Sequence, residues 1–136
     1  MTPVFADTHY FIALLNPADQ DHERAVRWTA ANPRPIVTTE FVLTEVADGM
    51  ARFGRRHVFG QCHHIVTRHS GIRVAPASHE LFERGVALYL DRQDQEWTLT
   101  DCISFVVMRD LGLSEALTAD HHFEQAKMVA LLRLPD

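Results

Sequence analysis

Residues 97–123 decide the fold, and they read WTLTDCISFVVMRDLGLSEALTADHHF. Thr100 is expected to cap a helix whose first turn contains Asp101, where a negative charge suits the helix dipole. Residues 102–108 are apolar around most of a helical circumference, which is typical of a buried helix. Gly112 is expected to end this helix.

A short strand and a second aspartate follow the buried helix. Residues 116–118 are expected to form the strand, and Asp120 stands just beyond its end. In a parallel sheet a strand runs antiparallel to the helix before it, so the start of the helix and the end of the strand lie at the same edge. Asp101 and Asp120 should therefore converge where open α/β sheets bind their ligands.

The rest of the chain alternates short apolar strands with longer helices. Further strands are expected at residues 3–6, 36–38, 72–75 and 128–132, and further helices at residues 9–15, 22–31, 39–53, 55–68 and 81–90. This alternation predicts an α/β fold, with a central parallel sheet of about five short strands and helices on both faces. No linker or repeat divides the sequence, so residues 1–136 are expected to form a single domain.

Two further acids are placed to reach the same edge of the sheet. Asp7 directly follows the first strand, whose carboxyl end lies there. Glu45 falls in an apolar stripe from Phe41 to Phe53, where a charge needs a partner or a cation. Taken singly, the aspartates are explained by capping and Glu45 by a salt bridge. Taken together they are explained less well, because like charges gathered at one edge repel and raise each other's pKa.

The chemistry of these four acids favours a hard divalent cation. No lysine lies near them in the sequence, and clustered oxygen ligands without cysteine or histidine fit Mg²⁺ or Mn²⁺. Such ions clamp phosphates and activate water for phosphodiester hydrolysis. The nine histidines show no zinc-binding spacing. Adjacent histidines such as His121 and His122 point about 100° apart on a helix and should not share a metal, so the histidines are interpreted as solvated surface residues.

The composition limits the remaining possibilities. A net charge of −5 argues against a protein that coats nucleic acid non-specifically, since such binding comes from neutralising phosphates. Cys62 and Cys102 lack a metal-binding spacing and are expected to be free thiols. No apolar run approaches the ~20 residues that span a bilayer, and the N-terminus lacks a signal-peptide pattern. A cytoplasmic location without membrane association is therefore expected.

Arginine dominates the basic residues and gathers in one segment without acids. Residues 51–79 contain five arginines and no aspartate or glutamate. Arginine offers phosphate a bidentate fork and offers bases a stacking plane, so this segment is a candidate RNA-binding surface, although arginine preference also follows from genomic base composition. The candidate RNA-binding residues are Arg52, Arg55, Arg56 and Arg68.

Four motifs together carry a family resemblance. They are FADT at residues 5–8, TEFVLTE at 39–45, LTDCIS at 99–104 and ALTADHHF at 116–123. In this order and spacing, over essentially the whole chain, they resemble the PIN-domain nucleases, and among them the VapC-type toxins of bacterial toxin–antitoxin pairs. The resemblance implies a three-layer PIN-like fold, a homodimer, and neutralisation by a small antitoxin.

The resemblance also implies a site. The acidic quartet around Mg²⁺ or Mn²⁺ would be Asp7, Glu45, Asp101 and Asp120, with Thr8, Thr100 and Ser104 as supporting hydroxyls. Asp7 and Asp101 would ligate the metal most directly, and the other two acids would complete the site or orient water. Many relatives have a glycine-containing turn before the final strand, where this chain has Lys127.

The expected function is therefore that of a metal-dependent endoribonuclease, the toxin of a toxin–antitoxin pair. One alternative is a catalytically inactive domain of the same fold that binds RNA or protein. Another is a phosphatase with an aspartate nucleophile, but such enzymes have Asp-x-Asp at the first strand, and here His9 occupies the third position.

Overall fold

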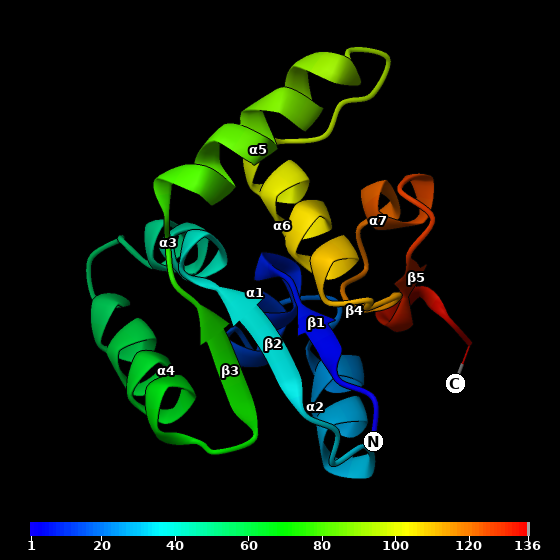
Figure 1. Ribbon diagram of the computed structural model, residues 1–136. Coiled ribbons are helices and arrows are strands. Elements are labelled where there is room, and N and C mark those ends of the chain that lie inside the picture. Colours follow the sequence, from blue (N-terminus) through cyan, green and yellow to red (C-terminus); the bar gives the residue numbers. More distant parts are fainter. Residues whose placement is uncertain (136) are drawn as a thin grey trace.

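The computed structural model describes residues 1–135 and contains one parallel sheet in that range (Figure 1). The strands are β1 (Val4–Ala6), β2 (Ile36–Thr39), β3 (Ile72–Ala75), β4 (Glu115–Leu117) and β5 (Val129–Ala130). They lie in the order β3-β2-β1-β4-β5, and all neighbouring pairs are parallel. The central strand is thus the first in the chain, paired with β2 on one side and β4 on the other. This confirms the predicted parallel α/β fold.

Seven helices connect these strands along residues 1–135. They are α1 (Thr8–Leu15), α2 (His22–Ala31), α3 (Glu40–Gly49), α4 (Arg56–Arg68), α5 (His79–Asp91), α6 (Leu99–Asp110) and α7 (His121–Gln125). The chain steps from β1 to β3 in one direction and from β4 to β5 in the other, and right-handed crossovers then place helices on both faces of the sheet. α1 packs against α2, and α5 packs along α6, as Figure 1 shows.

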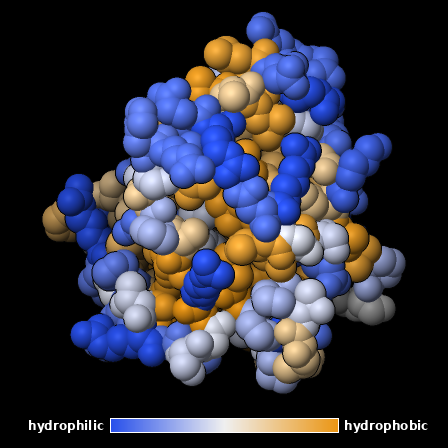
Figure 2. All heavy atoms as spheres, viewed as in Figure 1, coloured by the Kyte–Doolittle hydropathy of each residue, from blue (hydrophilic) through white to orange (hydrophobic). Residues whose placement is uncertain are grey.

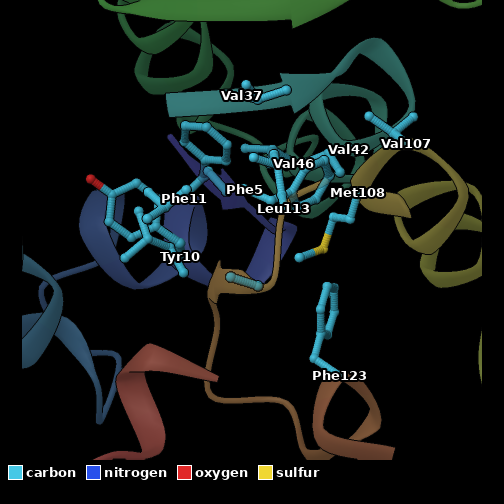
Figure 3. Close-up of a cluster of buried hydrophobic side chains, with 14 of the residues drawn as sticks. Phe5, Tyr10, Phe11, Val37, Val42, Val46, Val107, Met108, Leu113 and Phe123 are labelled. Carbon is cyan, nitrogen blue, oxygen red and sulfur yellow. The ribbon is translucent and has the colours of Figure 1, made fainter. Parts of the chain in front are cut away.

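The core is densest around α6. Every residue of this helix from Asp101 to Met108 is buried, which confirms the predicted buried helix. Figure 3 shows Phe123 of α7 reaching toward Met108, with Phe5 of β1 deeper in the cluster. The rings of Phe105 and Phe123 meet edge to face with centroids 4.9 Å apart. α7 is therefore fixed to α6 by aromatic packing.

The start of α6 differs from the sequence-based expectation. Thr98, not Thr100, is the N-cap: its hydroxyl accepts from the Asp101 N–H, and the Asp101 side chain accepts from the Thr98 N–H. This reciprocal capping box requires an acid three residues after the cap, a spacing that Thr98 satisfies and Thr100 does not. Gly112 ends the helix with a positive φ of 67°, as predicted.

The helix predicted over residues 39–53 is shorter than expected. Thr39 caps α3, whose last residue is Gly49, and the chain then turns through Gly54, which has a φ of 83°. The apolar periodicity misled because it continues past the break: Phe53 lies in this turn and is fully exposed. The final predicted strand is also short, since only Val129 and Ala130 pair with β4 before a 3-10 turn.

Lys127 occupies an unusual backbone position at the end of α7. Its φ is 69°, and it is the one non-glycine residue with a positive φ among residues 1–135. Side chains other than glycine rarely adopt this left-handed conformation. The turn before the final strand, where the family resemblance implies a glycine, is therefore built here with a lysine. None of the helices in the same range has the length and apolar character needed to cross a bilayer.

Candidate metal centre

Three aspartates meet at the carboxyl edge of the sheet. Asp7 follows β1, Asp101 lies in the first turn of α6, and Asp120 comes after β4. The Thr118 hydroxyl donates to Asp7 Oδ2 at 2.9 Å and links the ends of β1 and β4. The charges of Asp101 and Asp120 both raise the pKa of Asp7, so the three carboxylates lie within electrostatic reach of one another.

Asp7 is the most strongly perturbed of the three. It is only 4% exposed, and burial is the main cause that raises its pKa from 3.8 to about 7, followed by the charge of Asp101. The hydrogen bond from Thr118 opposes this rise. The side chain of Asp7 makes no capping hydrogen bond to α1. A cap therefore does not explain this buried acid.

Asp101 and Asp120 both have capping roles as well. Asp101 is 6% exposed and accepts from the backbone of Thr98 at 3.1 Å. Burial is the largest cause raising its pKa, and the charge of Asp120 adds to it. Asp120 caps α7 by accepting from the backbone N–H of His122 at 2.9 Å. Capping thus accounts for the backbone contacts of these two acids but not for their proximity to Asp7.

Glu45 is hydrogen-bonded to a hydroxyl next to Asp7. The Thr8 Oγ1–H donates to Glu45 Oε1 at 2.6 Å, which ties the carboxylate of α3 to the residue that follows Asp7. Of the other two expected hydroxyls, Thr100 lies partly exposed in the first turn of α6. Ser104 Oγ is buried and has no hydrogen-bond partner among the residues that the structure describes.

Two contributors to this site were missed by sequence reasoning. Thr118 was assigned to the strand, yet β4 ends at Leu117, and the Thr118 side chain bonds to Asp7. His122 was interpreted as a solvated surface residue, which is wrong. Its side chain is 19% exposed, and its Nδ1 lies 3.2 Å from Asp120 Oδ1 and 3.5 Å from Asp101 Oδ2. Its proximity in sequence to Asp120 was the one available signal.

The donor set fits a divalent cation. His122 Nδ1 is buried and makes no hydrogen bond to any residue in the range 1–135, although it faces two carboxylates. Asp120, His121 and His122 each place one potential ligand atom within 4.8 Å of the other two, although adjacent histidines on a helix are expected to point apart. Carboxylate oxygens are suitable ligands for Mg²⁺ or Mn²⁺, and the imidazole nitrogen of His122 lies beside them.

The candidate RNA-binding arginines lie elsewhere on the surface. Arg52, Arg55 and Arg56 are exposed around the turn between α3 and α4, and Arg68 is exposed at the end of α4. α4 packs against β3, at the opposite edge of the sheet from β5 and α7 (Figure 1). The predicted free thiols Cys62 and Cys102 are both buried and unpaired in the described chain.

Comparisons with known proteins agree with this fold. The PIN domain pattern matches residues 4–128. The 23S rRNA-specific endonuclease VapC20 of Mycobacterium tuberculosis is 28% identical over 127 residues, which cover 93% of this chain and 95% of that protein. The crystal structure of M. tuberculosis VapC20, described as a sarcin–ricin loop cleaving toxin, superposes with a TM-score of 0.85 at 27% identity, covering 93% of this chain and 96% of that one.

More distant structures share the fold alone. FitAcB from Neisseria gonorrhoeae superposes with a TM-score of 0.64 at 17% identity, over 93% of this chain and 94% of that one. A toxin–antitoxin complex from Klebsiella pneumoniae superposes with a TM-score of 0.60 at 21% identity, over 87% of each chain. With the family pattern matching nearly its whole length, this chain belongs to the PIN domain family and is a homologue of the VapC-type toxins.

Proposed function

We propose that this protein is a Mg²⁺- or Mn²⁺-dependent endoribonuclease that acts as the toxin of a toxin–antitoxin pair. The observation that carries the proposal is the coupling of buried Asp7 to Asp101 and Asp120. Within residues 1–135, the ion pairs of Asp101 and Asp120 are with the imidazoles of His121 and His122 and not with a lysine or arginine. Like charges gathered at one buried site repel one another, and a bound cation relieves that cost.

In the proposed site each acid has a role that its contacts support. Asp7 and Asp101 ligate the ion directly, with the Thr118 hydroxyl orienting Asp7. Glu45, held by Thr8, and Asp120 complete the site or orient the attacking water. When bound, the divalent ion polarises the scissile phosphate and lowers the pKa of its bound water.

The test is cleavage of RNA by Asp101→Asn. The amide is a neutral and weaker ligand of nearly the same shape, so metal-dependent cleavage should fall below a tenth of the wild-type rate. Asp110→Asn is the matched control on the same helix, since the carboxylate of Asp110 binds Arg84 at the surface, and its activity should be near normal. If Asp101→Asn retains a tenth or more of the wild-type activity, Asp101 is not a ligand of the metal.

The same assay separates the enzyme from a catalytically inactive RNA- or protein-binding domain. EDTA should abolish cleavage by the proposed nuclease, whereas simple binding would survive it. The 23S rRNA sarcin–ricin loop is the first RNA to test, because the similar VapC20 protein is described as cleaving it. Absence of cleavage of any RNA with Mn²⁺ present, together with EDTA-resistant binding, would favour the inactive domain.

We assign RNA-backbone binding to the exposed arginines around α4. Replacing Arg55 and Arg56 together with alanine should weaken RNA binding and flatten its salt dependence by up to about two contacts, at roughly 0.7 per phosphate on single strands. The matched control replaces Arg84 and Arg92, which already bind Asp110 and Asp94. If both double variants show the same dependence of RNA affinity on salt concentration, the α4 arginines do not contact the RNA backbone.

An apolar groove supports an antitoxin partner. It measures about 620 Å³, lies between α1, α2 and α4, and is lined by Phe11, Leu14, Trp28, Val58 and Ile65 among others. A groove of this character accepts the apolar face of an amphipathic helix. Expression of this chain alone in a bacterium should arrest growth, and co-expression of its cognate antitoxin should relieve the arrest. Growth arrest by Asp101→Asn as strong as by the wild type would contradict a nuclease toxin.

A homodimer is supported by the exposed face of α5. Phe82, Tyr89 and Leu90 are 40%, 47% and 57% exposed, and Figure 2 shows hydrophobic side chains gathered on this face of the molecule, over the sheet and along α5. Such a stripe is buried in many protein interfaces. Light scattering should give twice the monomer mass for the wild type and a monomer after Leu90→Glu. A wild-type monomer at micromolar concentration would refute the dimer.

A further inference from the structure

The imidazole of His122 is held in an orientation that its own hydrogen bonds do not explain. Its Nδ1 is buried, faces Asp101 and Asp120, and forms no hydrogen bond with any described residue. Buried polar atoms of native proteins nearly always have a partner. A ligand that binds where this nitrogen and the two carboxylates converge would supply the partner that it lacks.

The backbone around His122 fixes this orientation. The His122 N–H is bound by Asp120 Oδ1 at 2.9 Å, and the next residue, Phe123, is fully buried against Phe105. At the other end of α7, Gln125 accepts from the Trp97 indole N–H at 3.2 Å. The short helix is thus anchored on both sides of the imidazole. The backbone of His122 is therefore held in place beside the two carboxylates.

The distances suit coordination better than direct hydrogen bonding. Neighbouring ligand atoms of an octahedral ion with bonds of about 2.1 Å lie roughly 3 Å apart. The nitrogen lies 3.2 Å from Asp120 Oδ1 and 3.5 Å from Asp101 Oδ2. Both separations are close to this spacing, so the nitrogen and either of these carboxylates can be neighbouring ligands of one cation.

We infer that His122 is a nitrogen ligand of the divalent ion and gives the site a preference for Mn²⁺ over Mg²⁺. This inference rests on the proposed metal-dependent function. Mg²⁺ prefers oxygen ligands and its water shell, whereas Mn²⁺ lies higher than Mg²⁺ in affinity for imidazole. A site of carboxylates alone would discriminate less between the two ions, so the histidine sets which metal is bound.

The experiment is pulsed electron paramagnetic resonance of Mn²⁺ bound to the full chain, without substrate. Coordinated imidazole nitrogen modulates the Mn²⁺ spin echo, and labelling with ¹⁵N-histidine changes that modulation. The wild type should show this nitrogen coupling, and His122→Ala should lose it. The matched control, His121→Ala, removes the neighbouring exposed imidazole and should keep it. Because the wild-type spectrum is the primary readout, the test does not depend on the folding of the variant.

Metal affinity provides a second readout. His122→Ala should bind Mn²⁺ at least tenfold more weakly, a loss no smaller than the roughly 10–100-fold caused by removing an outer-shell partner. Its Mg²⁺ affinity, measured by competition with Mn²⁺, should change much less. His122→Gln, which keeps a polar side chain without the imidazole, should lose the nitrogen coupling too.

The outcomes distinguish this inference from the proposed function. Wild-type protein that binds Mn²⁺ with a signal dependent on Asp101, but without nitrogen coupling, would overturn the role of His122 and leave the nuclease site standing. Nitrogen coupling lost in His121→Ala instead of His122→Ala would also overturn it. Wild-type protein that binds no Mn²⁺ would overturn both.

Discussion

The metal-free protein should lose stability as the pH rises, and Asp7 should be the main cause. Burial and the charge of Asp101 raise the pKa of Asp7 from 3.8 to about 7. Between these two values the native state holds a proton that the unfolded chain releases, so the free energy of unfolding falls with increasing pH. At 1.36 kcal/mol per pKa unit, the full cost above pH 7 is about 4 kcal/mol.

Asp7→Asn removes this titration and provides the measurement. Relative to the variant, the wild type in EDTA should lose about 3 kcal/mol of unfolding free energy between pH 5 and pH 8, from the same linkage. For a domain of this size, the melting temperature of the wild type should therefore fall by roughly 10 °C more than that of Asp7→Asn between pH 5 and pH 8. Comparing slopes rather than single values cancels the nine histidines, which both proteins share, and any constant effect of the amide.

A control and a metal titration complete the test. Asp110→Asn removes an exposed acid whose pKa is lowered by Arg84. That acid is ionised in both folded and unfolded states throughout pH 5–8, so its variant should run parallel to the wild type. Mn²⁺ at pH 8 should restore stability to the wild type far more than to Asp7→Asn, since metal binding requires the deprotonated ligand. Parallel stability curves for Asp7→Asn and wild type would refute the reasoning.

Three further predictions concern capping, packing and metal binding. Thr98→Ala should lower the unfolding free energy by about 1 kcal/mol, and Thr100→Ala by much less; equal losses in denaturant titrations would contradict the assigned cap. Gly85→Ala should destabilise the protein by roughly 1–3 kcal/mol because its Cβ would lie 2.3 Å from Ile103 Cγ1. Gly60→Ala, which has open space around it, should be neutral or stabilising. The reverse order of melting temperatures would disprove the α5–α6 packing. Mn²⁺ at ten times its dissociation constant should add about 1.4 kcal/mol, or about 4 °C, to the wild type, and an unmoved melting curve would argue against a metal site.

The features that follow from apolar periodicity and from the positions of strand ends could be predicted from the sequence. The apolar run of α6 specified a buried helix, and alternating elements specified a parallel sheet, so the placement of Asp7, Asp101 and Asp120 at one edge followed from topology alone. The cap at Thr98 was also available, because its spacing to Asp101 is that of a capping box.

The missed features depend on contacts between distant segments. Whether an apolar residue such as Phe53 faces the core depends on where its helix ends. The apolar periodicity of the sequence continues past Gly49, where α3 ends. His122 was predicted to be a surface residue because adjacent histidines are usually exposed to solvent. Its burial follows from Phe123 packing against Phe105 of another helix, and Thr118 gained its partner only because β1 and β4 are neighbours.

The position of β1 at the centre of the sheet has a consequence for synthesis of the protein. The Thr118 hydroxyl that orients Asp7 lies 111 positions along the chain from it, and β4 cannot pair with β1 until that late segment has been made. Synthesis proceeds from the N-terminus at about 5–20 residues per second, so a growing chain carries Asp7 for seconds before the other half of the site exists. Long-range closure of this kind is also slow in folding. Under the proposed function, a growing chain would therefore lack a complete nuclease site until Thr118 has been made and β4 has paired with β1.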